Sequence, residues 1–185
     1  MIKILIADDQ QLIRDSIKII LESNEDFSVT ATVGNGKEVL SSIEKNKPNV
    51  ILMDVRMPVM DGTVCTKYVK EIYPDIKVII LTTFDDDDFI FSALKYGASG
   101  YLLKGGSPAD LFTAIRTVAQ GGAMINPDIT EKVFRLFSKM AQANYTISVN
   151  DQETKDFSKS EWCVIQQVGL GLSISVSPYR QQIPA

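Results

Sequence analysis

Several polar residues of this 185-residue sequence stand where short apolar runs end. They are Asp8 and Asp9 after residues 2–7, Asp54 after residues 50–53, Thr82 after residues 78–81, and Lys104 after residues 100–103. Apolar runs of this length, bounded by turn-forming residues, are typical of buried strands. The carboxyl ends of parallel strands meet at one edge of a sheet. We therefore expect three carboxylates, a hydroxyl and an ammonium group to share one shallow pocket.

This set of side chains is suited to phosphoryl transfer. Three neighbouring carboxylates cannot all stay ionised without compensation, and a hard divalent cation such as Mg²⁺ is their natural partner. Lys104 and Thr82 are suited to phosphoryl oxygens, and the central Asp54 to the role of nucleophile. A single acidic residue at a strand end is usually a turn former or helix cap. Because the residues at four strand ends all fit the same reaction, we favour a shared phosphoryl-transfer site over four separate turns or caps.

The elements that would position these residues alternate along the chain. Five apolar runs, each followed by an amphipathic stretch, predict an α/β fold with a doubly wound, five-stranded parallel sheet of the flavodoxin-like type. We expect this domain to cover residues 1–123. Residues 124–157 are interpreted as a linker with one helix at 129–140. Residues 158–185 would form a short helical remnant with an irregular tail.

Composition excludes several classes of protein. The apolar fraction of 45% and charged fraction of 23% are those of a globular domain. A net charge of −4 disfavours non-specific attraction to nucleic acid or anionic membranes. No apolar stretch reaches the ~20 residues of a membrane span, and Asp8 and Asp9 interrupt the N-terminal run too early for a signal peptide. Cys65 and Cys163 lack metal-site spacing and are expected to be packing residues. We therefore expect a cytoplasmic protein.

Residues 1 to about 122 resemble a response-regulator receiver domain. The resemblance rests on the sequence stretches 4–9, 53–58, 61–62, 81–83 and 100–104. It implies that Asp54 accepts a phosphoryl group from the phosphohistidine of a sensor histidine kinase in a two-component phosphorelay. The sequence contains no histidine, so that donor must belong to another molecule. The resemblance further implies a phosphoacceptor switch that is not an enzyme beyond slow self-dephosphorylation, and pairing as a homodimer.

The same resemblance assigns roles to individual residues. Asp9 and Asp54 would bind Mg²⁺ directly, Asp8 mostly through water, and the backbone carbonyl of Arg56 would complete the protein ligands. Thr82 and Tyr101 would be the switch pair, with Thr82 and Lys104 stabilising the phosphoryl group; packing alone is the alternative role for Tyr101. Arg56 and Phe84 would tune the lifetime of the phosphate. Many receivers have Lys-Pro where this sequence has Lys104-Gly105, so the geometry of that loop is left open.

Residues 157–173 resemble the opening of a LuxR-type helix-turn-helix domain, which places the sequence near the NarL/LuxR class of transcriptional regulators. After Ser173 this resemblance ends. The remaining residues are too few for the scaffold helix and the recognition helix that such a domain needs. Arg180 is their only basic residue, whereas DNA phosphates normally need several. We therefore expect a truncated effector domain, and we identify no DNA-binding residue.

Other functions remain as alternatives. One is an intact DNA-binding transcriptional regulator, and another is a stand-alone receiver that acts through protein–protein contacts. A haloacid-dehalogenase-type phosphatase would need Asp-x-Asp after the first strand, whereas Asp8 and Asp9 are adjacent. A flavodoxin would need a Ser/Thr/Gly phosphate loop at that place. The sequence therefore fits neither a phosphatase of this type nor a flavodoxin well.

Overall fold

The structure is a computed structural model that describes the backbone of residues 1–83 and 86–147. The chain divides into two compact units, Met1–Leu136 and Phe137–Ala185. The first unit contains the sheet and every residue of the expected phosphorylation site. It includes the first turns of the helix that the sequence analysis assigns to the linker. The expected helix-turn-helix remnant at 158–185 lies outside the described residues.

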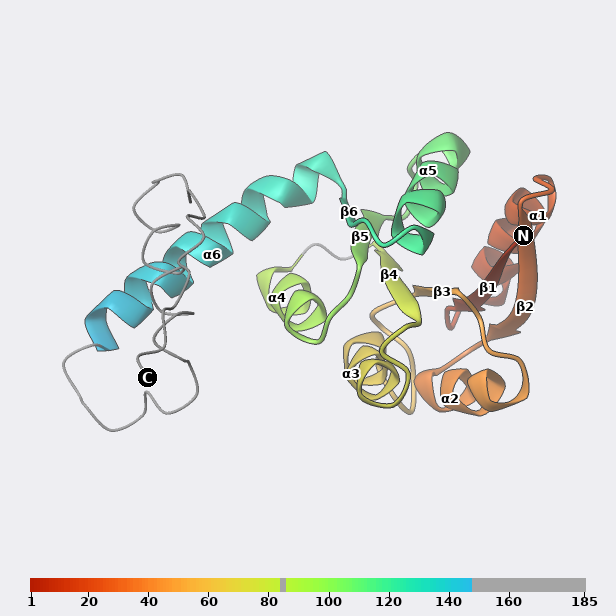
Figure 1. The fold of residues 1–185 in the computed structure, drawn as a ribbon, viewed down its shortest axis with the longest axis horizontal. Helices are drawn as coiled ribbons and strands as arrows, with labels where there is room; N and C mark the ends of the chain where they lie inside the picture. Colours follow the sequence, from red (N-terminus) through yellow and green to blue (C-terminus); the bar gives the residue numbers. More distant parts are fainter. Residues whose placement is uncertain (84–85, 148–185) are drawn as a thin grey trace, which may run out of the picture. The chain divides into compact units, whose positions relative to one another are not determined.

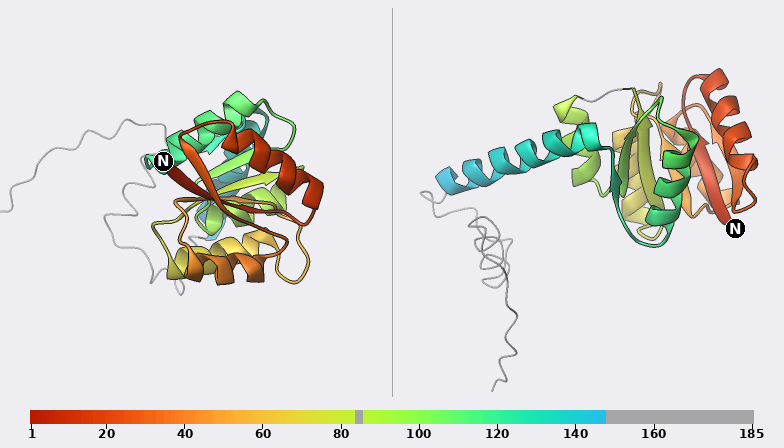
Figure 2. Two further views of the ribbon diagram at one scale, coloured as in Figure 1. Left: turned by 90° about the vertical axis from the view of Figure 1, so that its right-hand side faces the viewer. Right: turned by 90° about the horizontal axis from the view of Figure 1, so that it is seen from above.

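The first unit is a parallel sheet with helices on both faces (Figures 1 and 2). The strands are β1 (Ile2–Ala7), β2 (Phe27–Val33), β3 (Val50–Met53), β4 (Lys77–Thr82), β5 (Gly100–Leu103) and β6 (Met124–Ile125). The helices are α1 (Gln11–Glu22), α2 (Gly36–Lys45), α3 (Gly62–Ile72), α4 (Asp87–Lys95), α5 (Pro108–Ala119) and α6 (Pro127–Ile147). The strand order is β2-β1-β3-β4-β5-β6, which confirms the predicted doubly wound architecture.

The alternation of side chains along each strand divides the core between the two faces of the sheet. On β1, Ile4 and Ile6 belong to the cluster that packs under α1 and α5. Leu5 and Ala7 belong to the other cluster, which packs under α2, α3 and α4. Because both faces are covered, the strands read as continuous apolar runs rather than as an alternating pattern.

The prediction of five strands was one short. β6 pairs in parallel with β5 and joins Met124 to Gly100 and Ile125 to Tyr101. Two residues are too few to produce a recognisable period, so the sequence pattern could not reveal this strand. It forms only because the chain after α5 returns to the open edge of β5.

Polar side chains stand at the starts of two helices. The Ser107 hydroxyl accepts a hydrogen bond from the Asp110 amide, with Pro108 in the first turn of α5. The acidic run precedes and opens α4, with Asp86 at the N-cap position. α6 begins at Pro127 and ends at Ile147, so it exceeds the predicted range of 129–140 at both ends. Within the described residues, no helix has the length and apolar character that a membrane crossing requires.

Candidate functional site

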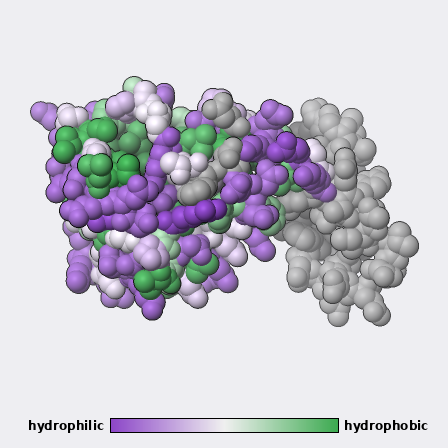
Figure 3. Space-filling model, turned by 180° about the vertical axis from the view of Figure 1, so that it is seen from behind, coloured by the Kyte–Doolittle hydropathy of each residue, from purple (hydrophilic) through white to green (hydrophobic). Residues whose placement is uncertain are grey.

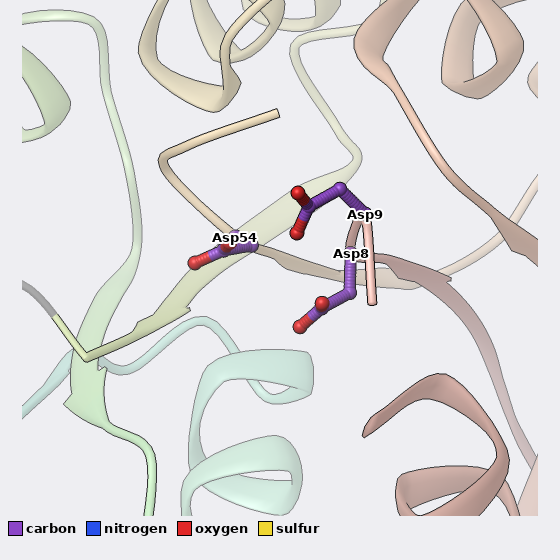
Figure 4. A group of neighbouring side chains, drawn as sticks. All are labelled: Asp8, Asp9 and Asp54. Carbon is purple, nitrogen blue, oxygen red and sulfur yellow. The ribbon is translucent and has the colours of Figure 1, made fainter. Parts of the chain in front are cut away.

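The three acidic residues meet at the carboxyl edge of the sheet. Asp8 and Asp9 directly follow β1, and Asp54 directly follows the neighbouring strand β3. Each residue offers a carboxylate oxygen, and these oxygens lie within 4.8 Å of one another. Figure 4 shows the carboxylates on the same side of the loops that carry them. The edge therefore brings together the three carboxylates that the sequence places there.

Lys104 and Thr82 complete the pocket from the next two strands. The ammonium nitrogen of Lys104 lies 2.6 Å from Oδ2 of Asp8 and 3.3 Å from Oδ1 of Asp54. The hydroxyl of Thr82, at the end of β4, donates a hydrogen bond to the Asp54 carboxylate. The backbone amide of Lys104 donates to the carbonyl of Thr82 at 2.8 Å, which fixes the two residues side by side. The structure thus brings together five of the predicted site residues.

Asp54 is a buried carboxyl group with incomplete compensation. Its exposed fraction is 3%, and burial, the largest effect, raises its pKa above the usual value. The positive charge of Lys104 and the hydrogen bond from Thr82 lower the pKa, and the nearby charge of Asp8 raises it. Oδ1 of Asp54 accepts no hydrogen bond that meets geometric criteria from the described residues, although the Lys104 ammonium lies 3.3 Å away and pairs with it electrostatically. A buried oxygen of this kind keeps unused capacity to accept a hydrogen bond or to bind a cation.

The donor set fits a hard divalent cation. Carboxylate oxygens are preferred ligands of Mg²⁺, and opposite ligands of an octahedral Mg²⁺ lie about 4.2 Å apart. The separation of the three carboxylates in the structure, up to 4.8 Å, is close to this value. Asp9 is exposed whereas Asp8 and Asp54 are buried, so a cation entering from solvent would meet Asp9 first. The cluster can therefore hold a metal ion.

The backbone around Asp54 is fixed by contacts that the sequence analysis missed. A Cβ atom at Gly62 would lie 1.9 Å from the carbonyl oxygen of Asp54, so only glycine permits this close approach. The amide of Gly62 also donates to the carbonyl of Val55 at 2.8 Å. Residues 61–62 are one of the stretches that carry the resemblance to a receiver domain, but this backbone contact was not predicted. The signal that could have indicated this contact is the position of the pair, a few residues after Asp54 in the same loop.

The loop after β1 is also held by contacts that were not predicted. The guanidinium group of Arg14 donates to the backbone carbonyl of Asp8. Oδ1 of Asp8 accepts a hydrogen bond from the amide of Gln10 at 2.9 Å. These contacts, together with Lys104, fix the position of the Asp8 carboxylate.

The remaining predicted residues have different settings. The side chain of Arg56 is half exposed; its guanidinium lies 3.7 Å from Oδ2 of Asp86 and 5.3 Å from the centre of the Phe89 ring. Tyr101, on β5, is fully buried. Phe84 lies outside the described residues. The Lys104–Gly105 peptide is trans, and Gly105 has a φ of 101°, a conformation that favours glycine over proline at this place.

Known proteins share this fold and this order of elements. The family model "Response regulator receiver domain" matches residues 4–116. The transcriptional regulatory protein LnrK of Bacillus subtilis (strain 168) is 36% identical over 174 residues, which make up 94% of this chain and 79% of LnrK.

Solved structures agree with this match. A LuxR-family DNA-binding response regulator from Staphylococcus aureus is 30% identical, with a TM-score of 0.62 over 64% of this chain and 99% of that one. A structure of two RcsB dimers bound to two parallel DNAs has a TM-score of 0.65 over 93% of this chain and 84% of that one. At 22% identity this last likeness concerns the fold alone. The chain belongs to the two-component response regulators of the NarL/LuxR family, and its first unit contains their receiver domain.

Proposed function

We propose that this chain is a phosphoacceptor switch in which Asp54 receives a phosphoryl group from the phosphohistidine of a sensor histidine kinase. The observation that carries the proposal is the setting of Asp54. Its carboxylate is buried at the carboxyl edge of the sheet, beside a lysine and two further carboxylates, and Oδ1 accepts no hydrogen bond from the described residues.

The residues of the pocket have distinct roles in this transfer. A carboxylate oxygen of Asp54 attacks the phosphorus atom; the new O–P bond forms as the N–P bond of the phosphohistidine breaks, and the imidazole leaves with the electron pair. The Lys104 ammonium and the Thr82 hydroxyl are placed to hold phosphoryl oxygens. Asp8, Asp9 and Asp54, with the backbone carbonyl of Arg56, would hold Mg²⁺. When bound, this cation neutralises charge on the carboxylates and the phosphoryl oxygens.

Incubation with acetyl phosphate and Mg²⁺, followed by intact-mass measurement, tests the proposal. We expect the wild type to gain the mass of one phosphoryl group, which EDTA abolishes. Asp54→Asn should gain none, whereas Asp75→Asn, which alters an exposed carboxylate at the opposite edge of the sheet, should behave as the wild type. Phosphorylation of Asp54→Asn would refute the assignment of the acceptor.

The surface offers a place for a second copy of the chain. Figure 3 shows a hydrophobic patch over α1, where Leu12 and Ile19 are 78% and 70% exposed. Beside it lies an apolar cavity of about 580 Å³ between α1 and α5, lined by residues that include Ile13, Ile20 and Leu111. We include homodimer formation in the proposal, since RcsB is described as dimeric on DNA. Sedimentation at several concentrations, for the wild type and Leu12→Ser, measures it.

Transcription regulation is the second part of the proposed function. It rests on the relatives, because LnrK is named a transcriptional regulatory protein. The residues that would contact DNA, 158–185, lie outside the described residues. From the sequence, we expect them to be too few to form a complete DNA-binding helix-turn-helix domain. A gel-shift assay with promoter fragments separates a DNA-binding regulator from a cytoplasmic receiver that acts through protein contacts.

A further inference from the structure

The start of α6 is built into the same side of the core as the expected switch residue. Ile129 has an exposed fraction of 0% and Val133 of 8%, although both belong to the helix that leads out of the sheet. They share one cluster of packed side chains with Tyr101 of β5 and with Ile90 and Ala93 of α4. The first turns of α6 therefore form part of the core that surrounds the switch.

The backbone connects the same parts. β6 lies along the outer edge of β5 and pairs Ile125 with Tyr101. The amide of Asn126 donates to the carbonyl of Tyr101 at 2.9 Å, and the carbonyl of Asn126 accepts from the amides of Ile129 and Thr130. The strand that carries Tyr101 is thus connected directly, through one residue, to the first turn of α6.

This arrangement limits what Tyr101 can do. Its ring has an exposed fraction of 0%, at an edge of the sheet where β6 and α6 lie against the same cluster. A well-packed core has no space for a second position of a tyrosine ring. Because residues 125 and 126 bond to the strand that carries Tyr101, and Ile129 and Val133 belong to its cluster, we infer that movement of the ring out of the core shifts residues 124–133.

We propose that Ile129 and Val133 are positioning residues of the phosphorylation switch: docking of α6 against α4 and β5 holds Tyr101 inside the core and so favours phosphorylated Asp54. The inference rests on the proposed function and on the expected role of Tyr101 in the switch pair, with its ring turned inward when Asp54 is phosphorylated. Thr82 connects the phosphorylation site with the strand that carries Tyr101. Its hydroxyl donates a hydrogen bond to Asp54, and its backbone carbonyl accepts one from the amide of Lys104, which directly follows β5. Coupling of this kind is reciprocal, so phosphorylation must tighten the docking of α6 by the same factor.

Two valine truncations form a matched pair for the test. Val133→Ala weakens α6 docking, whereas Val39→Ala removes the same atoms from a buried position on α2 in the same cluster. Both should lower stability by similar amounts. Only Val133→Ala should shorten the half-life of the acyl phosphate and lower its steady-state level with acetyl phosphate, by about fivefold as typical couplings are. Ile129→Val, a milder change, should shift both quantities in the same direction.

Hydrogen exchange of the wild type tests the reciprocal effect. Amides of residues 124–136 should exchange about fivefold more slowly after phosphorylation, while those of α2 keep their rates. If the wild type gains no phosphoryl group, or Asp54→Asn gains one, the proposed function fails and this inference fails with it. If the wild type behaves as expected but Val133→Ala matches Val39→Ala, or the exchange of 124–136 does not slow, the coupling alone is overturned.

Discussion

Lys104 is the residue whose removal should most directly reveal the electrostatics of the pocket. Its ammonium group lies 2.6 Å from Asp8 and 3.3 Å from Asp54, two carboxylates that are 2% and 3% exposed. At an effective dielectric constant near 20, opposite unit charges 3.3 Å apart attract each other by about 5 kcal/mol. Burial of the lysine itself offsets part of this attraction. Removal of one partner from a buried ion pair typically costs about 3–5 kcal/mol, because the other charges are left uncompensated.

We expect Lys104→Met to lower the free energy of unfolding by about 3–5 kcal/mol at pH 7 in EDTA. Mg²⁺ should restore part of the loss, since it compensates the same carboxylates. The loss should also shrink as the pH falls, because protonated Asp54 no longer needs the ammonium, and burial raises the pKa of Asp54 so that its protonation begins above the usual range.

Urea unfolding followed by circular dichroism measures this difference. Lys47→Met is the matched control, because Lys47 pairs with Asp75 at 2.8 Å on the surface, where both side chains are about half exposed or more. Such exposed pairs contribute about 0–1 kcal/mol. A loss for Lys104→Met no larger than that of the control, or one that Mg²⁺ leaves unchanged, would refute this account of the pocket.

Further perturbations probe the other features of the site. Gly62→Ala should destabilise the protein by more than about 2 kcal/mol, because its Cβ would meet the Asp54 carbonyl at 1.9 Å; Gly34→Ala, with its nearest neighbour at 3.7 Å, should cost less in the same urea assay. Asp54→Asn should raise stability at pH 7 without Mg²⁺. The folded-state pKa of Asp54 is raised, so its ionisation opposes folding increasingly as the pH rises above the unfolded-state pKa and fully above the folded-state pKa, and the gain should vanish at pH values below both. Burial raises the pKa of Cys65 to about 12, so its peptide should resist alkylation at pH 8 until urea unfolds the protein. If Phe84 shields the acyl phosphate from water, Phe84→Ala should shorten its half-life; a half-life equal to or longer than that of the wild type would contradict this role.

Site residues at the ends of strands could be predicted from the sequence, whereas residues that support the site through backbone contacts could not. Asp8, Asp54 and Lys104 were predicted because each directly follows an apolar run, and the parallel pairing of β1, β3, β4 and β5 places those run ends together. Arg14 and Gly62 were not identified as parts of the site. Their contacts are to backbone carbonyls of Asp8 and Asp54, and no pattern of residue types announces which carbonyl a loop will approach.

The sequence alone determined the alternation of buried strands and amphipathic helices, and with it the parallel sheet and the edge at which the carboxylates gather. This follows because hydrophobic period and chain order constrain a doubly wound fold almost completely. Only the tertiary structure decided the raised pKa of Asp54, the addition of β6, and the burial of Ile129 and Val133 beside Tyr101. These features depend on the distances and the exclusion of water among segments far apart in the chain, which no local pattern encodes.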